Sequence, residues 1–500
     1  MYRLDGFRDV KKFRKFKDPE FFQTQNSDYY LLPFRFHRIN ERKEVLVNEV
    51  GDFLIAPIGT ATRIANREVT VNDSIYPDLV ANFFISDKPI PVLIDVLATR
   101  YRTKKSFLND FTGLHIFVIS LRCEHTCHYC QVSRVTQNKN KYDMSFKTID
   151  KGIDLMMASP NPHVTMEFQG GEALLAFDKI KYAVERAKRL AFEKNKKITF
   201  VICTNLALVN QEILQYCKEN EILISTSLDG PKFIHDANRN KPHASSYDLA
   251  IKGIELSRQV LGHDKVSALM TTTQLSLKYP YEIVDEYFNR GFSGVFLRNI
   301  SPYGFALRTE KNRYGTKAFL DFYKKALQRV IEYNLQGHYF EESFTKIILT
   351  KMLTPFNEGF VDLQSPAGAV SGVIVFNYDG GVYASDESRM LAEQNDFTFK
   401  LGTVNDSYDD IFFGSKAQEI TQVSTNESLA GCSDCAFQTY CGADPVHNWA
   451  TQGDVYGYRP TSDFCIKNME IIRYIIELID GNEKELMPIF HSWINKSLRF

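Results

Sequence analysis

From about residue 113, short β-branched runs alternate with amphipathic stretches. Six such runs occupy residues 114–122, 163–170, 197–205, 222–230, 265–273 and 294–300. Between them, apolar residues recur at intervals of three and four, the spacing of one helix face. Because the runs are continuously apolar, they predict parallel strands wrapped by helices. This α/β pattern predicts a partial (β/α)6 barrel, two units short of a closed eightfold barrel.

The alternation covers only the middle of the 500-residue chain, which is too long for one hydrophobic core. Residues 1–105 predict two or three short strands, in YYLLPFRFHRI and EVLVNEVGDFLIAP, together with helices. After Gly337 the alternation stops, and four cysteines gather between residues 432 and 465. We therefore expect an N-terminal α+β domain over 1–105, a barrel over 106–340 and a cysteine-bearing domain over 341–500.

The charge and the apolar runs exclude two classes of partner. A formal net charge of −1, from 60 basic and 61 acidic residues, does not predict a nucleic-acid surface. The N-terminus has no signal-peptide core, and no apolar run of about 18 residues predicts a membrane span. We expect a cytoplasmic protein without membrane partners. Nine cysteines in that reducing compartment indicate metal binding or catalysis rather than disulfides.

Three cysteines directly follow the first predicted strand, in LRCEHTCHYC. Cys123, Cys127 and Cys130 have the spacing C-x3-C-x2-C. Thiolates suit iron–sulfur clusters, and three can hold three corners of a four-iron cube while the fourth iron stays open. A structural zinc ion bound with His125 or His128 is the alternative. Two further cysteines, in a predicted strand and a predicted helix, are interpreted as small buried apolar residues: Cys203 and Cys217.

Two features beside the triad favour the cluster over zinc. Tyr129 precedes the last cysteine and could shield a cluster. The second predicted strand ends in EFQGGEAL, where Gly170 and Gly171 permit close backbone approach and Glu172 offers a carboxylate to an ammonium group. In a parallel barrel this turn lies at the same edge as the cysteine loop.

The triad, the aromatic residue before its last cysteine and the Gly-Gly-Glu turn resemble the radical S-adenosylmethionine (SAM) superfamily over about residues 113–300. The resemblance implies a catalytic [4Fe–4S] cluster held by the three cysteines, with SAM on its open iron and a 5′-deoxyadenosyl radical as the reagent. It also implies SAM contacts at the turn and at later strand ends. Two family positions differ here, since Ala173 replaces a proline and Leu206 a glycine. The implied SAM-contacting residues are Tyr129, Gly170, Gly171, Glu172, Thr204, Asn205, Ser227 and Asp229, with Arg298 touching SAM or substrate.

A second set of cysteines has the spacing C-x2-C-x5-C-x23-C. Cys432, Cys435, Cys441 and Cys465 can ligate either a zinc ion or an iron–sulfur cluster completely, and the spacing leaves both open. The stretch resembles the SPASM extension of peptide-modifying radical SAM enzymes. That resemblance implies one auxiliary [4Fe–4S] cluster with four cysteine ligands.

The SPASM resemblance is incomplete. Where the full family pattern has cysteines, this chain has Ser385, five residues after Gly380, and Pro445. The cysteines of a first auxiliary cluster are therefore missing. The resemblance also implies that Asp386 faces the substrate, where a carboxylate can act as a general base.

Longer phrases, including YYLLPFRFHRI, YDGGVYASDESRM and CGADPVHNWATQGDVYGYRPTSDFC, resemble the radical SAM maturase of the His-Xaa-Ser peptide system. That family implies a ribosomally made precursor peptide with His-Xaa-Ser repeats, a second radical SAM maturase and an external electron donor. The N-terminal domain is similar to winged-helix elements that bind leader peptides at a sheet edge. A packing cap for the barrel is the alternative role.

Two other hypotheses remain. An enzyme like the anaerobic sulfatase maturases would share the radical chemistry and act on a protein. A zinc-stabilised, non-catalytic peptide-binding protein would hold zinc at both cysteine sets and need no SAM.

Overall fold

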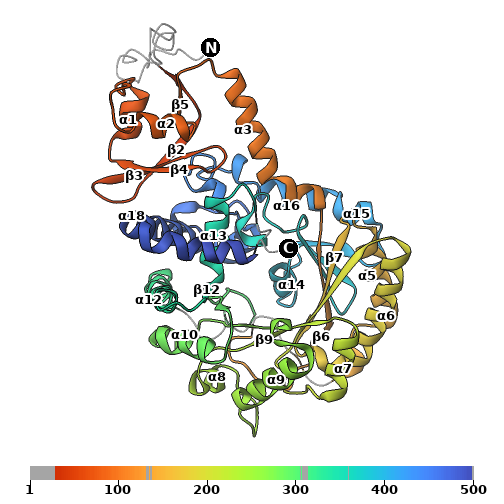
Figure 1. Ribbon diagram of the computed structural model, residues 1–500. Helices are drawn as coiled ribbons and strands as arrows, with labels where there is room; N and C mark the ends of the chain where they lie inside the picture. Colours follow the sequence, from red (N-terminus) through yellow and green to blue (C-terminus); the bar gives the residue numbers. More distant parts are fainter. Residues whose placement is uncertain are drawn as a thin grey trace, which may run out of the picture.

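The computed structural model describes residues 29–130, 135, 138–304, 306, 314–357 and 360–497. Residues 1–28 lie outside them, and so does the N-terminus that is expected to lack a signal peptide. A small N-terminal unit stands above a larger body made of the barrel and the C-terminal region (Figure 1).

The first five predicted strands of the barrel are present and parallel. They are β6 (Leu114–Ser120), β7 (His163–Gly170), β8 (Lys197–Cys203), β9 (Leu223–Ser227) and β10 (Val266–Leu269), and each pairs with the next. The α/β fold is thus confirmed.

The sixth predicted strand is much shorter than residues 294–300. Only β11 (Gly294–Val295) forms, and it pairs with β12 (Glu341–Glu342) rather than with β10. Beyond it, the Leu297 N–H donates to the Glu342 side chain at 3.1 Å. One backbone bond, from Thr272 N–H to the Arg298 carbonyl at 2.9 Å, still ties this segment to the chain after β10.

The barrel sheet continues into the C-terminal third of the chain. β13 (Val373–Phe376) pairs in parallel with β6, and β14 (Gly381–Tyr383) and β15 (Lys400–Thr403) add antiparallel strands. The result is an eight-stranded mixed sheet in the order β10-β9-β8-β7-β6-β13-β14-β15. The C-terminal region is therefore built onto the first barrel strand.

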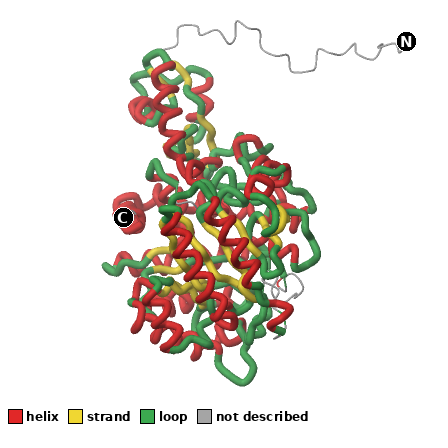
Figure 2. Tube along the Cα trace, turned by 90° about the vertical axis from the view of Figure 1, so that its right-hand side faces the viewer, coloured by secondary structure: helices red, strands yellow, loops and turns green. Residues whose placement is uncertain are grey.

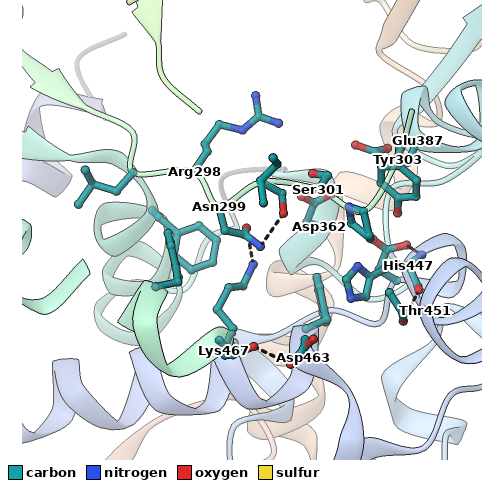
Figure 3. Close-up of a pocket in the computed structure, with 18 of the residues that line it drawn as sticks. Arg298, Asn299, Ser301, Tyr303, Asp362, Glu387, His447, Thr451, Asp463 and Lys467 are labelled. Carbon is teal, nitrogen blue, oxygen red and sulfur yellow. Dashed lines mark hydrogen bonds between the residues drawn. The ribbon is translucent and has the colours of Figure 1, made fainter. Parts of the chain in front are cut away.

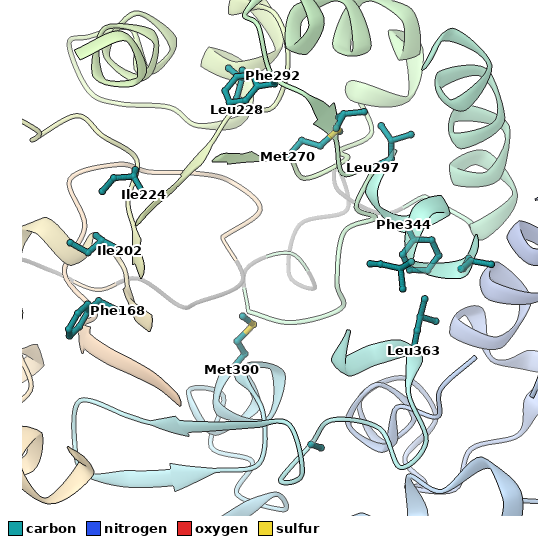
Figure 4. Packing of buried hydrophobic residues seen from close by; sticks show 14 of the residues in the cluster. Phe168, Ile202, Ile224, Leu228, Met270, Phe292, Leu297, Phe344, Leu363 and Met390 are labelled. Carbon is teal, nitrogen blue, oxygen red and sulfur yellow. The ribbon is translucent and has the colours of Figure 1, made fainter. Parts of the chain in front are cut away.

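Helices cover the outer face of the sheet (Figures 1 and 2). Their apolar faces meet side chains that stand in register on neighbouring strands, such as Phe168, Ile202 and Ile224 on β7, β8 and β9 (Figure 4). The barrel helices are α5 (Phe146–Ala158), α6 (Phe177–Glu193), α7 (Gln211–Glu219), α8 (Lys232–Asn238), α9 (Ser246–Leu261), α10 (Pro280–Asn289) and α12 (Thr316–Leu335), with the short α4 (Lys139–Tyr142) before them.

The N-terminal unit is α+β, with a small core of its own. β2 (Phe34–Arg38), β3 (Lys43–Asn48) and β4 (Phe53–Pro57) form an antiparallel sheet. The remaining elements are β1 (Tyr30–Leu31), β5 (Ile85–Ser86), α1 (Thr60–Ala65), α2 (Tyr76–Ala81) and α3 (Pro91–Lys104), the last of which runs down to the main body (Figure 1).

The C-terminal region is mostly helical. It contains α13 (Ser343–Leu353), α14 (Asp386–Ala392), α15 (Tyr408–Phe412), α16 (Ser415–Val423), α17 (Pro445–Gln452) and α18 (Asp463–Ser497), which is interrupted at Asn482. Single 3₁₀ turns lie at Ser106–Asp110, Ala173–Ala176, His263–Lys265, Ser276–Lys278, Val361–Leu363, Asn426–Ser428, Gln438–Tyr440 and Arg459–Thr461. Within the described residues, every helix is too short or too polar to cross a membrane.

Candidate functional site

A cavity of about 260 Å³ lies at the carboxyl ends of the barrel strands, and we call it the strand-end cavity. Its position follows from the parallel sheet, which brings the loops after all its strands to one edge. Eleven of the site residues predicted from the sequence line it: Cys123, Cys127, Tyr129, Cys130, Gly170, Gly171, Thr204, Asn205, Ser227, Arg298 and Asp386. Glu172 and Asp229 are buried behind this lining.

The cysteine loop is anchored at several points. Before it, Arg122 forms a buried ion pair with Asp143, with Nε 2.6 Å from Oδ1. Within it, the Thr126 N–H donates to the Asn240 carbonyl at 2.7 Å. Burial raises the pKa of the Cys123 thiol. A coordinated metal cation would deprotonate such a buried thiol.

The geometry of the loop bears on the choice between zinc and a cluster. Within the described part of the chain, Cys123, Glu124 and His125 form the one group whose ligand atoms all come within 4.8 Å of one another. The three Sγ atoms of the triad do not form such a group. Thiolates about 2.3 Å from one zinc ion lie within about 4 Å of each other. At least one pair of the triad's sulfurs is therefore farther apart in this structure than two thiolates on one zinc ion.

Tyr129 is held by a buried ion pair. Its hydroxyl donates to Asp229 Oδ2 at 2.7 Å, and Arg239 Nε donates to the same oxygen at 3.1 Å. The guanidinium lies 5.4 Å from the centre of the Tyr129 ring and also lines the strand-end cavity. Asp229 is fully buried, so in this structure it orients Tyr129 and Arg239. Sequence reasoning missed Arg239, because it lies beyond a helix and not at a strand end.

The two glycines of the Gly-Gly-Glu turn are required by the neighbouring backbone. A Cβ on Gly170 would lie 1.9 Å from the Ser120 carbonyl oxygen, and one on Gly171 would lie 2.4 Å from that of Arg122. The N–H groups of Gly171 and Glu172 donate to the same two carbonyls, at 2.8 and 2.7 Å. The turn is thus fixed directly to the strand end that begins the cysteine loop.

Glu172 is 1% exposed and accepts three hydrogen bonds. The donors are the Leu174 N–H at 2.9 Å, the Thr204 hydroxyl at 2.7 Å and the Asn205 N–H at 2.8 Å. Burial raises the pKa of Glu172 to about 7, although these donors favour the carboxylate. The side chain therefore joins the ends of β7 and β8, and a contact with an ammonium group would use its remaining lone pairs.

Two residues that the sequence singled out, Leu206 and Cys203, lie at or near the end of β8. Leu206, where the family has glycine, has a φ of +62°, in the left-handed region that glycine favours. Cys203 lines the strand-end cavity, with Sγ 3.4 Å from Glu167 Oε1, so the expectation of a purely apolar role was wrong. Cys217 is fully buried in the core, as predicted.

Asp386 is the first residue of α14 and faces the strand-end cavity. Its Oδ1 accepts from the fully buried guanidinium of Arg389 at 2.8 Å. The next residue, Glu387, lines the same cavity and was missed because only the position equivalent to Asp386 was singled out. Burial and the carboxyl of Asp362 raise the pKa of Glu387.

The structure brings the four C-terminal cysteines together. Burial raises the pKa of the Cys432 thiol, that of Cys435 to about 11 and that of Cys465 to about 12. The neighbouring thiols, Cys441 among them, add to each rise, so the four thiols lie near one another. Among the described residues, no three of these sulfurs lie within 4.8 Å of one another.

The positions of the missing SPASM cysteines begin helices. Ser385 caps α14 by accepting from the Ser388 N–H at 3.2 Å, and Pro445 is the first residue of α17. Gly380, with a φ of +88°, lies in the tight turn between β13 and β14.

The N-terminal unit contacts the second cysteine set directly. Arg35 Nε donates to the Ser433 carbonyl at 2.6 Å, and the Tyr440 hydroxyl donates to the Gly51 carbonyl at 2.8 Å. These bonds pack the N-terminal unit against the C-terminal cysteine region; its role as a packing cap for the barrel stays a prediction. Leader-peptide binding by this unit stays a prediction.

Comparisons with known proteins agree with this geometry. The family model described as "Radical SAM superfamily" matches residues 117–287. Two uncharacterised archaeal proteins, from Methanothermobacter thermautotrophicus and Methanocaldococcus jannaschii, are 31% and 35% identical over 36% and 23% of this chain. The chain spans only 66% and 38% of their lengths.

A cysteine-type anaerobic sulfatase-maturating enzyme of Clostridium perfringens is 24% identical, over 59% of this chain and 81% of its own. Two solved structures share the fold. One is native anSMEcpe with bound AdoMet and the Cp18Cys peptide, which has a TM-score of 0.60 and 19% sequence identity; the match covers 74% of this chain and 99% of that one. The other is Streptococcus suis SuiB bound to precursor peptide SuiA, which has a TM-score of 0.50 and 16% sequence identity; the match covers 88% of this chain and 99% of that one. Residues 117–287 thus form a domain that matches the Radical SAM superfamily.

Proposed function

We propose that this chain is a radical SAM enzyme that removes a hydrogen atom from a ribosomally made peptide and so installs a post-translational modification. The observation that carries the proposal is the direct attachment of the cysteine loop to the Gly-Gly-Glu turn at the mouth of the strand-end cavity. In this proposal the cluster and SAM meet at this junction.

Cys123, Cys127 and Cys130 would hold the catalytic cluster, which together with SAM supplies the 5′-deoxyadenosyl radical. The remaining polar groups of the strand-end cavity would bind and orient SAM. Asn205 and Ser227 offer uncharged hydrogen-bonding groups, and Arg239 offers a buried cation for a carboxylate. Tyr129 would cover the cluster and limit the access of water.

Asp386 is our candidate for the proton acceptor. It lines the strand-end cavity, and an ion pair with Arg389 fixes its orientation. A carboxylate held in this way can take a proton as the substrate is oxidised.

Cys432, Cys435, Cys441 and Cys465 would hold the auxiliary cluster with no open iron. Such a cluster can pass electrons or stabilise the fold, but it cannot bind substrate. An external reductant would supply the first electron.

The peptide substrate is inferred from relatives that modify proteins or bind peptides. The finer assignment, to the His-Xaa-Ser system with its repeat-bearing precursor and a second maturase, rests on the phrases quoted from the sequence. A maturase acting on a sulfatase-like protein is the second candidate, because the Clostridium perfringens relative matches over 317 residues.

Anaerobic reconstitution with iron and sulfide tests the proposal. We expect about eight irons per chain, from two cubes, and formation of 5′-deoxyadenosine from SAM under reducing conditions. Replacement of Cys123, Cys127 and Cys130 by alanine should remove about half of the iron and abolish SAM cleavage. Reductive SAM cleavage by the triple variant, or zinc at both sites in active protein, would contradict the assignment.

A further inference from the structure

A second cavity, of about 350 Å³, adjoins the strand-end cavity. Arg298 and Glu387 line both cavities, so the two share a wall. The second cavity lies between the loop after β11 and the helices α17 and α18 (Figure 3). We call it the acidic cavity, because Asp362, Glu387 and Asp444 line it together.

The three acidic side chains come from separate segments and influence one another. Burial raises the pKa of Asp362, Glu387 and Asp444, and the mutual repulsion of the carboxylates adds to the rise for Asp362 and Glu387. The positive charges of Lys467 and Arg298 oppose this rise in the pKa of Asp362. Within the described residues, no nitrogen of Lys, Arg or His lies within ion-pair distance, 4.0 Å, of the three carboxylates. Lys467 and Arg298 line the same cavity without pairing with these carboxylates, and Asp463 adds a fourth acidic side chain, so the acidic side chains of the lining outnumber the lysine and arginine four to two.

Tyr303 supplies an independent indication of a ligand. It is 1% exposed, and its hydroxyl has no hydrogen-bond partner in the described part of the chain. Figure 3 shows it beside Glu387 at the acidic end. His447 also lines the cavity, and its Nε2 atom is buried and has no hydrogen-bond partner among the described residues. Buried polar atoms are normally hydrogen-bonded, so these two are available to a bound group.

The rest of the wall is aromatic. Phenylalanine rings meet edge to face there, with centroids 5.7 Å apart for Phe296 and Phe360. Such rings pack against aliphatic chains and attract cations. The phenylalanines of the wall are Phe296, Phe319, Phe344, Phe360 and Phe464.

We propose that the acidic cavity binds an arginine or lysine side chain of the peptide substrate. The aliphatic stem lies along the phenylalanines, and the cationic end lies between the three carboxylates and the Tyr303 hydroxyl. The inference rests on the proposed function, because the shared wall places the next part of the same peptide in the strand-end cavity. A basic residue near the modified residue would thus be a requirement for recognition.

Small uncharged and charged analogues can test the cavity on the reconstituted, full-length protein. Calorimetric titration with Nα-acetyl-arginine amide should give saturable binding, whereas the near-isosteric citrulline amide should bind about tenfold more weakly or worse. Nα-acetyl-lysine amide and norleucine amide form a second matched pair. Equal binding of arginine and citrulline, no saturable binding of either cation, or tighter binding of glutamate amide would overturn the proposal.

Substitutions locate the binding. Glu387→Gln and Asp444→Asn keep the shapes, and asparagine can still cap α17. Together the two substitutions should weaken the binding of Nα-acetyl-arginine amide by at least about tenfold. Asp409→Asn, at an exposed carboxylate on α15, should change nothing. Undiminished binding in the double variant would exclude this site.

A stability measurement separates a binding role from a structural one. If the carboxylates repel one another in the free protein, Glu387→Gln should raise the Tm while it weakens binding. A lower Tm together with unchanged binding would indicate a structural role. Reductive SAM cleavage is measured in parallel, since cation binding without SAM cleavage would refute the proposed function and, with it, the assignment of the bound cation to its peptide substrate.

Discussion

The Tyr129 hydroxyl donates to Asp229 Oδ2 at 2.7 Å, across the 100 residues that separate the cysteine loop from the end of β9. Asp229 also forms an ion pair with Arg239. The Asp229 side chain is fully buried, and that of Arg239 is 15% exposed. The aromatic residue of the cysteine motif is therefore positioned by a buried charge, and the motif depends on a residue far away in the sequence.

Asp229→Asn should lower the free energy of unfolding by about 3 kcal/mol, because it leaves the Arg239 guanidinium without its partner. Tyr129→Phe, which loses one hydrogen bond, should cost about 1 kcal/mol. Denaturation with urea measures both. Asp248→Asn is the control, since that ion pair with Lys232 is exposed, and it should leave stability unchanged. Equal stability of the Asp229 and Asp248 variants would argue against the buried pair.

Gly171→Ala should destabilise the protein by about 2 kcal/mol or more, because the new Cβ would lie 2.4 Å from the Arg122 carbonyl oxygen. The displaced turn should also reduce the iron bound after reconstitution. Gly315→Ala is the matched control, since no heavy atom of the described residues lies within 4 Å of its Cβ position and its φ of −79° suits alanine. Normal iron content in the Gly171 variant would show that the turn and the cysteine loop move independently.

SAM binding should depend on the ionisation of Glu172. Burial raises the pKa of this carboxyl to about 7, so the carboxylate that would pair with the SAM ammonium forms as the pH rises through that value. We expect SAM affinity to increase between about pH 6 and pH 7.5. Glu172→Gln should flatten this profile and weaken binding by about 1.5 to 3 kcal/mol. Equilibrium dialysis measures both, and a variant with the normal profile would remove Glu172 from the SAM site.

The two cysteine sets should have separable roles. Cys432→Ala with Cys435→Ala should remove about half of the iron and abolish peptide modification, while uncoupled SAM cleavage, which needs only the open cluster, partly remains. Iron analysis, 5′-deoxyadenosine formation and mass spectrometry of the peptide measure the three effects. Cys217→Ala in the core should leave the iron content unchanged. Peptide modification at the normal rate in the double variant would exclude electron transfer through this cluster.

The sequence alone determined which residues could meet at the active edge. Cys123, Gly171, Thr204 and Ser227 each follow a β-branched run, and the carboxyl ends of parallel strands share one edge whatever the details of packing. Local periodicity was sufficient for the five strands β6 to β10, because each is continuous and bounded by turns.

The tertiary structure decided what these residues touch. Glu172 accepts from Thr204 and Asn205, more than 30 residues away, and the sequence gives no sign of such long-range bonds. The addition of β13 to β6 and the shortening of β11 depend on which strand edges are free, and the acidic cavity depends on three segments meeting. Contacts of this kind are set by the packing of whole elements, which a local pattern does not contain.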